Sequence, residues 1–598
     1  MNSVLDWLAR AAERVDRRVG WSRLPVVLAV PVLVGLRRRL RELNLHDTGR
    51  GRADHPDAGE TDVGDYRIRR TLDGEFNDLG EPLMGSVGSR FGRNVPVAHT
   101  VPEPDDELLS PSPRLVSERL LARTEFQPAT TLNLLAAAWI QFEVHDWFSH
   151  GEVDDTWDIA VDSDDDWPQH PMRIKKTRPD PSPSPGPPTY VTDDTHWWDA
   201  SQLYGGTREF AHRLRTRQHG KLHVDELGLP PVDADADLTG PAGNFWVGLA
   251  LLHSLFLREH NAICDRLAVE YPALDDQRLY DTARLINAAV IAKIHTIDWT
   301  PAIIAHPTTK FAMRANWFGL LGERFERRFG RITGNDLLQG IPGSGTDHHG
   351  VPYSLTEEFV AVYRMHPLIP DDVVFRAVDD DRQLARWSMP DLLIDHVRQR
   401  LSETSMEDLF YSFGRAHPGA ITLHNYPNDL RRLQRVDGLL DLAAADILRV
   451  RERGVPRYNE FRRLFRLAPA ATFEELTGGD RALAVQLRDV YGDVERVDLM
   501  IGLYAEPMPA GFGFSDTAFR VFILMASRRL KSDRFLSRDF RAEVYTEAGM
   551  SWIRDADMRA VLLRHFKSLA PALAGVANPF APWTPTAPAD RRHTDDRR

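Results

Sequence analysis

Residues 356–370 of the chain read Thr-Glu-Glu-Phe-Val-Ala-Val-Tyr-Arg-Met-His-Pro-Leu-Ile-Pro. The spacing of the apolar residues predicts a helix from Thr356 to Tyr363. Tyr363 and His366 are three residues apart, so on a helix they would occupy adjacent points of one face. An imidazole that held a haem iron would then bring the phenol close to the macrocycle edge, where it could be oxidised. The alternative is an amphipathic helix whose Tyr and His pack against neighbours.

A second segment, residues 139–150, reads Trp-Ile-Gln-Phe-Glu-Val-His-Asp-Trp-Phe-Ser-His. On a helix Gln141 and His145 share a face with apolar residues, so an amide and an imidazole project together from a dry surface. Such a pair could serve a small polar ligand, whereas the alternative is a satisfied core histidine. His145 and His150 are five residues apart, which is a poor spacing for two zinc ligands on one helix.

The third segment, residues 194–205, reads Asp-Thr-His-Trp-Trp-Asp-Ala-Ser-Gln-Leu-Tyr-Gly. Alternate positions could direct oxygen atoms at a hard cation, and they are Thr195, Trp197, Asp199 and Ser201. Calcium takes six to eight oxygen ligands, some of them backbone carbonyls, and Asp146 would add a second carboxylate. In isolation the pattern is weak evidence, because turns rich in Asp and Ser are common.

Composition limits the classes of protein that fit. Of the 598 residues 42% are hydrophobic and 27% charged, which is typical of a globular protein and excludes a disordered or polytopic membrane chain. The net charge of −13 argues against nucleic acid as a partner. A single cysteine, Cys264, excludes a disulfide framework and a Cys-based metal cluster, so we expect an intracellular protein.

The chain opens with an amphipathic, Arg-rich segment, residues 1–45, that contains an apolar run at 24–36. The run is too short to span a bilayer, and a basic cluster follows it where a signal peptide would have a cleavage site. Two short apolar helices edged with Arg would lie in a membrane interface, so the protein would be soluble or peripheral on a membrane surface. A core helix with a solvated basic flank is the alternative.

Beyond this opening we expect an extended arm over residues 46–106, one helical domain over 107–579 and a loose polar tail over 580–598. The domain is predicted to be mainly α, because strand alternation is confined to short stretches. Ser515 is the predicted N-cap of its last long helix. The main helical patterns cover residues 115–148, 245–271, 278–304, 390–415, 439–454, 481–491 and 516–530. No Pro/Gly linker divides this body, which favours a single large domain able to bury a bulky planar cofactor.

The segment around Tyr363 and His366 resembles the proximal helix of the haem peroxidase–cyclooxygenase superfamily, also called animal haem peroxidases. More specifically, the chain is similar to the fatty-acid α-dioxygenases from about residue 21 to residue 564. The blocks that carry the resemblance are residues 139–147, 292–300 (Ala-Lys-Ile-His-Thr-Ile-Asp-Trp-Thr), 349–359, 457–463 and 525–530.

The resemblance implies a role for each matching residue. His366 would be the proximal iron ligand, Asn425 would accept the other N–H of its imidazole, and Tyr363 would carry the catalytic radical. His145 would be the distal haem histidine, with Gln141 as its amide partner. The fatty-acid carboxylate would be held by His295, Thr300 and either Arg528 or Arg529, of which we prefer Arg529. The calcium ligands would be Asp146, Thr195, Trp197, Asp199 and Ser201.

The reaction that the resemblance implies begins with removal of hydrogen from C2 of a fatty acid by the Tyr363 radical, with peroxide as activator. O2 then adds to give a 2-hydroperoxy acid, which can decarboxylate to an aldehyde one carbon shorter. Mammalian relatives link haem by an ester from the residue before the distal histidine. Here that residue is Val144, so we expect haem b without such an ester link. The alternatives are a bacterial-type haem peroxidase, a dioxygenase attacking another lipid position, and a non-catalytic haem-binding or membrane-surface protein.

Overall fold

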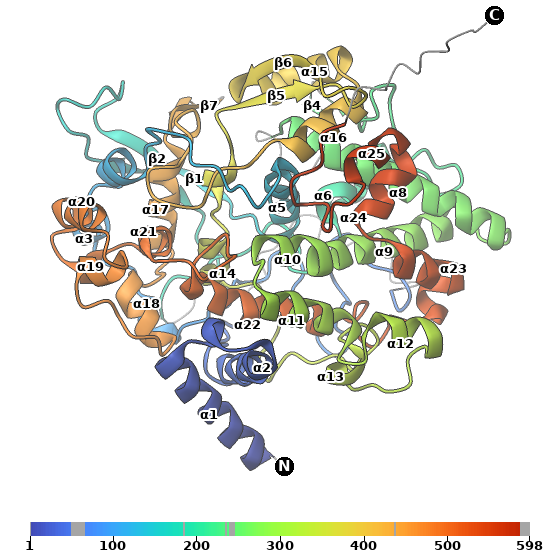
Figure 1. Cartoon of the computed structure of the whole chain (residues 1–598), viewed down its shortest axis with the longest axis horizontal. Helices are drawn as coiled ribbons and strands as arrows, with labels where there is room; N and C mark the ends of the chain where they lie inside the picture. The colour runs from blue at the N-terminus through green and yellow to red at the C-terminus, as the bar shows by residue number, and fades with distance from the viewer. Residues whose placement is uncertain are drawn as a thin grey trace, which may run out of the picture.

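The computed structural model describes residues 2–49, 66–182, 186–233, 236–237, 245–435 and 438–586. Helices make up most of this part of the chain (Figure 1). The strands that it contains form four separate antiparallel two-stranded sheets. The predicted mainly α fold is therefore confirmed.

The helices nearest the site are α5 (Leu134–Trp147), α6 (Ser201–Tyr204), α8 (Val247–Glu270), α9 (Asp276–Ile294), η5 (His295–Trp299), α10 (Thr300–Ile303), α14 (Glu357–Val362), η6 (His366–Leu368), α16 (Met406–Arg415), α17 (Leu442–Glu452) and α22 (Asp516–Ser532). Of these, α5 is almost entirely buried and packs against α6, α8 and α16. The remaining helices are α3 (Asp105–Leu108), α4 (Pro113–Val116), η4 (Ser117–Leu121), α7 (Arg208–Leu214), α11 (Pro307–Phe318), α12 (Gly322–Phe329), α13 (Asp336–Gln339), α15 (Val397–Glu403), α18 (Tyr458–Leu464), α19 (Phe473–Leu476), α20 (Arg481–Tyr491), α21 (Leu499–Ala505), α23 (Ala542–Asp555), α24 (Met558–His565) and α25 (Ala570–Leu573).

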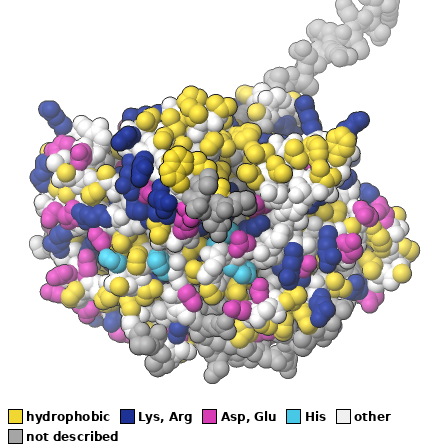
Figure 2. Space-filling model, turned by 90° about the horizontal axis from the view of Figure 1, so that it is seen from below, with side chains coloured by type: hydrophobic (Ala, Val, Ile, Leu, Met, Phe, Trp, Pro, Cys, Tyr) yellow, Lys and Arg dark blue, Asp and Glu magenta, His cyan; other side chains and the backbone are white. Residues whose placement is uncertain are grey.

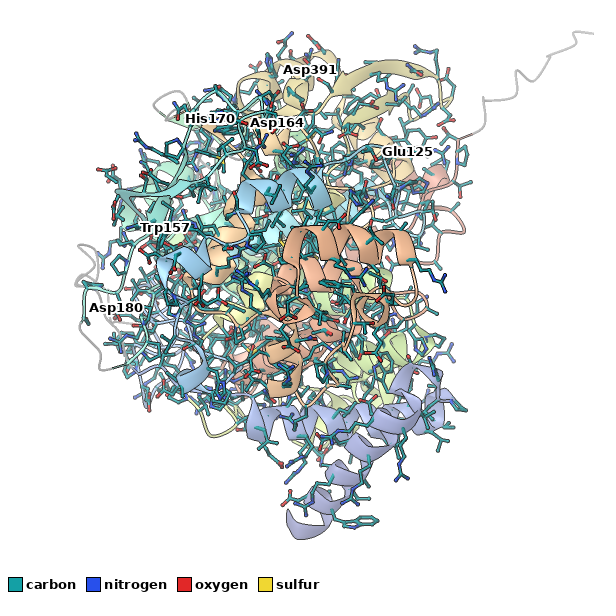
Figure 3. All side chains as sticks on the ribbon, turned by 90° about the vertical axis from the view of Figure 1, so that its left-hand side faces the viewer. Glu125, Trp157, Asp164, His170, Asp180 and Asp391 are labelled. Atoms are coloured by element: carbon teal, nitrogen blue, oxygen red, sulfur yellow. The ribbon has the colours of Figure 1, made fainter. Side chains whose placement is uncertain are left out.

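The strands lie at the periphery. They pair as β1 (Glu152–Ile159) with β2 (Met172–Thr177), β3 (Val232–Asp233) with β4 (Ala236–Asp237), β5 (Asp372–Arg376) with β6 (Gln383–Ser388), and β7 (Leu433–Arg435) with β8 (Gly438–Leu440). The β1–β2 hairpin, which carries Trp157, lies away from the N-terminal helices (Figure 3). It covers a small apolar cluster of its own against α17.

The first two helices, α1 (Asn2–Val19) and α2 (Val26–Leu43), lie together at one end of the molecule (Figure 1). Trp21 between them is buried, and its indole N–H donates to Asp516 at the start of α22, 2.8 Å away. Arg37 of α2 likewise donates to Asn316 of α11 at 2.8 Å. The amphipathic helical segment is thus fixed to the body. Among the described helices, none combines the length and the apolar character needed to cross a bilayer.

One continuous apolar core runs from the N-terminal helices to Trp583, which confirms the single large domain. Phe580 and Trp583 are buried, so the packed chain passes the boundary expected at residue 579. The rest of the expected tail, residues 587–598, lies outside the described residues, as does the part of the expected arm at 50–65.

Three predicted helices are wrong in their extent. The pattern at 390–415 is divided into two short turns followed by α15 and α16, which are separate because the backbone is extended at Thr404 and Ser405. The pattern at 115–148 is divided into α4, η4 and α5, because the chain between them leaves the helix at Ala122 and passes through Pro128. The helix predicted to bring Tyr363 and His366 onto one face ends at Val362, and His366 starts the separate turn η6. Pro367 explains this break, since a proline disfavours helical backbone at the residue before it. Ser515 is confirmed as the N-cap of α22.

Candidate functional site

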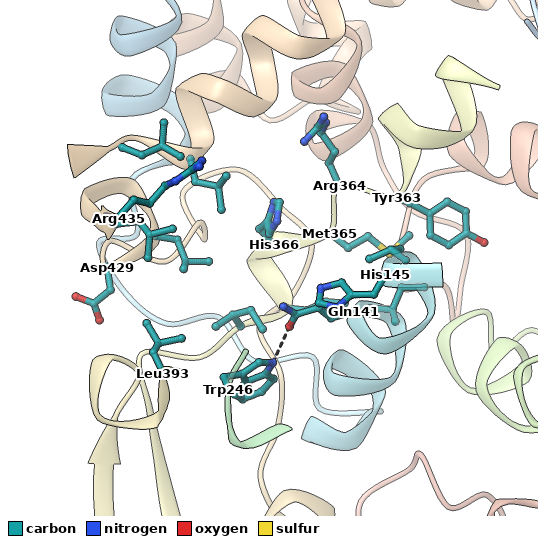
Figure 4. Close-up of a pocket in the computed structure, with 18 of the residues that line it drawn as sticks. Gln141, His145, Trp246, Tyr363, Arg364, Met365, His366, Leu393, Asp429 and Arg435 are labelled. Carbon is teal, nitrogen blue, oxygen red and sulfur yellow. Dashed lines mark hydrogen bonds between the residues drawn. The ribbon is translucent and has the colours of Figure 1, made fainter. Parts of the chain in front are cut away.

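A cavity of about 790 Å³ separates α5 from the segment 363–369 (Figure 4). Gln141 and His145 line it from α5, and Tyr363 and His366 line it from the segment that follows α14. The structure brings these four side chains to one cavity, as the resemblance implied, and their roles there stay a prediction. Its size and its mainly apolar walls fit a large planar group between two facing histidines.

On the α5 side, the Gln141 side-chain oxygen accepts a hydrogen bond from the indole N–H of Trp246 at 2.6 Å (Figure 4). This contact fixes the orientation of the amide. Burial lowers the pKa of His145 to about 4. At neutral pH this imidazole is therefore uncharged and able to accept a proton.

On the opposite side, the Nδ1 of His366 lies 2.6 Å from a carboxylate oxygen of Asp446 on α17. The same oxygen accepts from the Tyr426 hydroxyl at 2.9 Å, and the other oxygen pairs with Arg364. Burial opposes ionisation of Asp446, but the charges of His366 and Arg364 outweigh it and lower its pKa to about 2. An ionised Asp446 holds the proton of His366 on Nδ1 and leaves Nε2 as the nitrogen that can bind a metal.

The prediction that Asn425 contacts His366 is wrong. The Asn425 side chain accepts from the Arg123 guanidinium and from the backbone N–H of Gln127, both at 3.0 Å. It also donates to the carbonyls of Gln127 and Ala420 at 2.9 and 2.7 Å. These bonds use its amide to fasten a loop. Asp446 escaped the sequence analysis because it follows His366 by 80 residues and only the fold brings the two together.

Tyr363 is the C-terminal cap of α14, whose start is fixed by the Thr356 hydroxyl at its N-cap. The Tyr363 ring packs against Phe359, at a centroid distance of 4.4 Å, and against Trp147, at 5.3 Å. Burial raises the pKa of its phenol. The phenol therefore keeps its proton until it is oxidised.

Arg529 lies on α22 with its guanidinium between the rings of Trp147 and Trp198, 4.4 and 4.3 Å from their centroids. It is 1% exposed, and its Nε and Nη1 have no hydrogen-bond partner among the described residues. Its Nη2 donates to the backbone carbonyl of Trp197 at 3.1 Å. A buried guanidinium with unused donors is costly unless an anion binds there.

Arg528 differs, because its guanidinium donates to the backbone carbonyls of Val351 and Pro352 at 2.7 and 2.9 Å. These bonds fasten a loop. Arg529 has two nitrogens without a partner among the described residues and Arg528 has one, its Nε. Arg529 lies beside the ring of Trp147, which Tyr363 also contacts.

His295 lies on the same side, with its ring centroid 5.2 Å from that of Trp147. Its Nδ1 accepts from the Trp139 indole N–H at 3.2 Å, and burial followed by the charge of Arg529 lowers its pKa. The neutral ring therefore carries its proton on Nε2, which can donate to an anion. Thr300 is buried nearby, but its hydroxyl donates to the carbonyl of His295 at 2.7 Å. It would have to rotate to bind a carboxylate.

The residues expected to bind calcium come together around Asp146. One of its carboxylate oxygens accepts from the backbone N–H and the hydroxyl of Ser201 at 2.6 and 2.8 Å. The Thr195 hydroxyl donates to Asp199 at 2.8 Å. Burial, and next the charge of Asp199, raise the pKa of Asp146. Two buried carboxylates that repel each other suit a cation, although no group of three or more His, Cys, Asp or Glu side chains within the described ranges is placed to hold a metal.

Glu143 is a further buried acid that the sequence analysis did not single out. It lies on α5, one turn before Trp147. Neither of its carboxylate oxygens has a hydrogen-bond partner among the described residues. Burial, and next the charge of Asp146, raise its pKa. The sequence signal that could have found it is the apolar character of α5 on all sides, which is typical of a buried helix.

Comparisons with known proteins show the family to which the chain belongs. Residues 69–574 match the family model "Animal haem peroxidase". An α-dioxygenase of Oryza sativa subsp. japonica is 40% identical over 593 residues, which cover 95% of this chain and 94% of the relative. The crystal structure of Oryza sativa fatty acid α-dioxygenase matches with a TM-score of 0.89 at 38% identity, covering 98% of this chain and 97% of that one. A Tyr-to-Phe variant of that enzyme with palmitic acid matches with a TM-score of 0.89 at 37% identity and the same coverage. The chain therefore belongs to the animal haem peroxidases and, within them, to the α-dioxygenases.

Proposed function

We propose that the protein is a haem-dependent fatty-acid α-dioxygenase that oxidises C2 of its substrate. The observation that carries this proposal is that Trp147 contacts both the proposed radical residue and the proposed carboxylate anchor. Its ring contacts Tyr363 on one side and the Arg529 guanidinium on another, with His295 beside it. Two nitrogens of that guanidinium, Nε and Nη1, have no partner among the described residues. A carboxylate bound by Arg529 and His295 would hold its neighbouring carbon, C2, close to Tyr363. The palmitic acid found with the Oryza sativa enzyme is an acid of this kind.

Haem fits the cavity between His145 and His366, and bound there it would supply the oxidant for the phenol of Tyr363. His366 would hold the iron through Nε2, while Asp446 keeps the proton on Nδ1. The neutral His145 would accept a proton from the activating peroxide. The residue before His145 is Val144, which supports haem b without an ester link at this position.

The oxidised Tyr363 removes one hydrogen atom from C2, so the C–H bond breaks and the phenol O–H forms again. O2 adds to the carbon radical, and the resulting peroxyl group takes the phenol hydrogen back. The product is a 2-hydroperoxy acid and Tyr363 is again a radical. Loss of CO2 and water from this product gives an aldehyde one carbon shorter. The anchor contributes by fixing the reacting atoms before the barrier.

Calcium is proposed for the cluster of Asp146, Thr195, Asp199, Ser201 and the carbonyl of Trp197. The support is the pair of buried carboxylates surrounded by neutral oxygen atoms. The Trp197 carbonyl also accepts from Arg529, so an ion there would stiffen the anchor itself. We further propose peripheral membrane contact through residues 1–45, on which exposed apolar side chains include Trp7 and Val27.

The test is oxygen uptake by the haem-loaded protein with palmitic acid, coupled to product analysis. We expect uptake with a 2-hydroperoxy acid or the shortened aldehyde as product. The Tyr363→Phe variant should bind haem normally and consume no oxygen. The matched control is Tyr545→Phe, which removes a buried hydroxyl bonded to the carbonyl of Phe535, outside the cavity. Peroxide turnover without fatty-acid oxidation would instead indicate a plain haem peroxidase, and oxygenation at another carbon a different lipid dioxygenase.

A further inference from the structure

The end of the molecule that carries α1 and α2 has a second set of exposed apolar side chains, contributed by residues 320–338. Phe329 at the end of α12 is 59% exposed and Ile332 after it is 67% exposed. Trp7 of α1 and Val27 of α2 are 60% and 79% exposed. Figure 2 shows hydrophobic side chains gathered in a band across this end, with Lys and Arg side chains at both ends of the band.

The two sets meet at an apolar pocket of about 100 Å³ between α2, α11, α13 and α22. Val34 of α2 and Leu337 of α13 both line it and are themselves exposed, so the pocket opens on this face. Its inner wall includes Ile304, four residues after Thr300, and Ser527, two residues before Arg529. The pocket therefore touches the two elements that carry the proposed carboxylate anchor.

Charge on this face favours an anionic partner. Residues 1–45 contain nine arginines and four acidic residues, a net charge of +5, whereas the whole chain has −13. Arg10, Arg14 and Arg18 of α1 are exposed and form no ion pair with the described residues. Each arginine close to an anionic bilayer strengthens binding by about 1 kcal/mol, or about five-fold. A soluble partner of mixed charge would gain no such advantage.

We propose that α1, α2 and residues 320–338 form one docking face for an anionic lipid bilayer, and that acyl chains leave the bilayer through the pocket between them. This inference rests on the proposed fatty-acid substrate and extends the membrane contact from residues 1–45 to a second segment. Trp21 between α1 and α2 bonds to Asp516 of α22, and Arg37 of α2 bonds to Asn316 of α11, so the N-terminal helices are attached to two of the helices that line the pocket. Apolar side chains from both would enter the acyl region, with arginines at the headgroups.

The experiment compares three double variants of the full-length haem-loaded protein in co-sedimentation with vesicles. Vesicles of phosphatidylcholine with about a third phosphatidylglycerol are compared with vesicles of phosphatidylcholine alone. F329S/I332S tests the second segment and W7S/V27S tests the N-terminal helices. V269S/V485S is the control, because Val269 and Val485 are exposed apolar residues on α8 and α20.

We expect each of the first two variants to bind anionic vesicles about ten-fold more weakly, since each removes apolar surface worth roughly 1.4 kcal/mol. The control should stay within about two-fold of the natural protein. Oxygen uptake from vesicle-borne palmitic acid should fall with binding, while uptake from dispersed acid should not change. The proposal would be overturned if F329S/I332S bound anionic vesicles as tightly as the natural protein does. It would also be overturned if the natural protein bound neutral and anionic vesicles equally well. Self-association through this face without vesicle binding would overturn it too. Absence of oxygen uptake in every variant would refute the proposed function alone.

Discussion

Replacement of Arg529 by Lys is the sharpest perturbation of the substrate anchor. In the structure the guanidinium is held between two indole rings, and two of its nitrogens have no partner among the described residues. A fatty-acid carboxylate can accept from both in the bidentate manner that Arg permits. Lysine keeps the charge but offers a single point donor and loses the planar stacking on the rings.

The expected loss follows from these contacts. A hydrogen bond to a charged group contributes about 1.5–3 kcal/mol, and Arg529→Lys removes at least one such bond together with the fixed orientation. We expect kcat/KM for palmitic acid to fall by about 30- to 150-fold, which corresponds to about 2–3 kcal/mol of transition-state stabilisation. Both kcat and KM should change, because the anchor both binds the acid and positions C2 beside Tyr363.

The assay is the initial rate of oxygen uptake across a range of palmitic acid concentrations, with haem loading checked by absorption. Arg528→Lys is the matched control, because the Arg528 guanidinium donates to loop carbonyls. It should lower the melting temperature and leave kcat/KM within about three-fold of the natural protein. The reasoning is refuted if Arg529→Lys retains normal kcat/KM, or if the loss appears in Arg528→Lys instead.

Three further predictions concern the haem, the cation and acid stability. Asp446→Asn removes the anionic partner of His366, so the haem reduction potential should rise by on the order of 60 mV, about 1.4 kcal/mol for one electron. An unchanged potential in a spectroelectrochemical titration would contradict this role of Asp446. A calcium chelator should lower the melting temperature of the natural protein by about 2 °C and leave that of Asp199→Asn unchanged. Equal shifts in both proteins would contradict the proposed calcium site. Stability should fall as pH drops below 6.5, by up to about 1.4 kcal/mol per pH unit for each buried histidine, because burial lowers their pKa values to about 3–4 and the unfolded chain binds more protons. The histidines concerned are His145, His150, His196 and His253. Urea titrations of the apo protein between pH 7 and pH 4 measure how the free energy of unfolding changes with pH. A free energy of unfolding that does not change with pH would contradict the prediction.

Local pattern predicted the elements of the site well where contacts are near in sequence. Gln141 and His145 share a helical face because they are four residues apart, and α5 places both on the cavity. Tyr363 and His366 reach the same cavity even though Pro367 ends the helix between them. Residues three apart in the sequence lie close together whether or not the helix continues between them.

Contacts between distant segments were not predictable in this way. The partner of His366 is Asp446 on α17, and nothing in the spacing of the sequence favours it over Asn425. The stated preference for Arg529 over the adjacent Arg528 could not be derived from the sequence, because the choice depends on which direction each side chain takes from α22. Residues 322–329 form a short, strongly amphipathic helix, but nothing in the sequence shows that neighbouring elements leave its apolar residues uncovered. The exposure of Phe329 and Ile332 becomes visible only on the folded surface.

The most direct test of the central claim is the isotope effect on oxygen uptake with palmitic acid deuterated at C2, compared with acid deuterated at C3. If Tyr363 removes hydrogen from C2 of an acid anchored by Arg529 and His295, uptake should slow with the C2 label and remain unchanged with the C3 label. A slower rate with the C3 label, or no effect of either label on single-turnover rates, would contradict abstraction at C2.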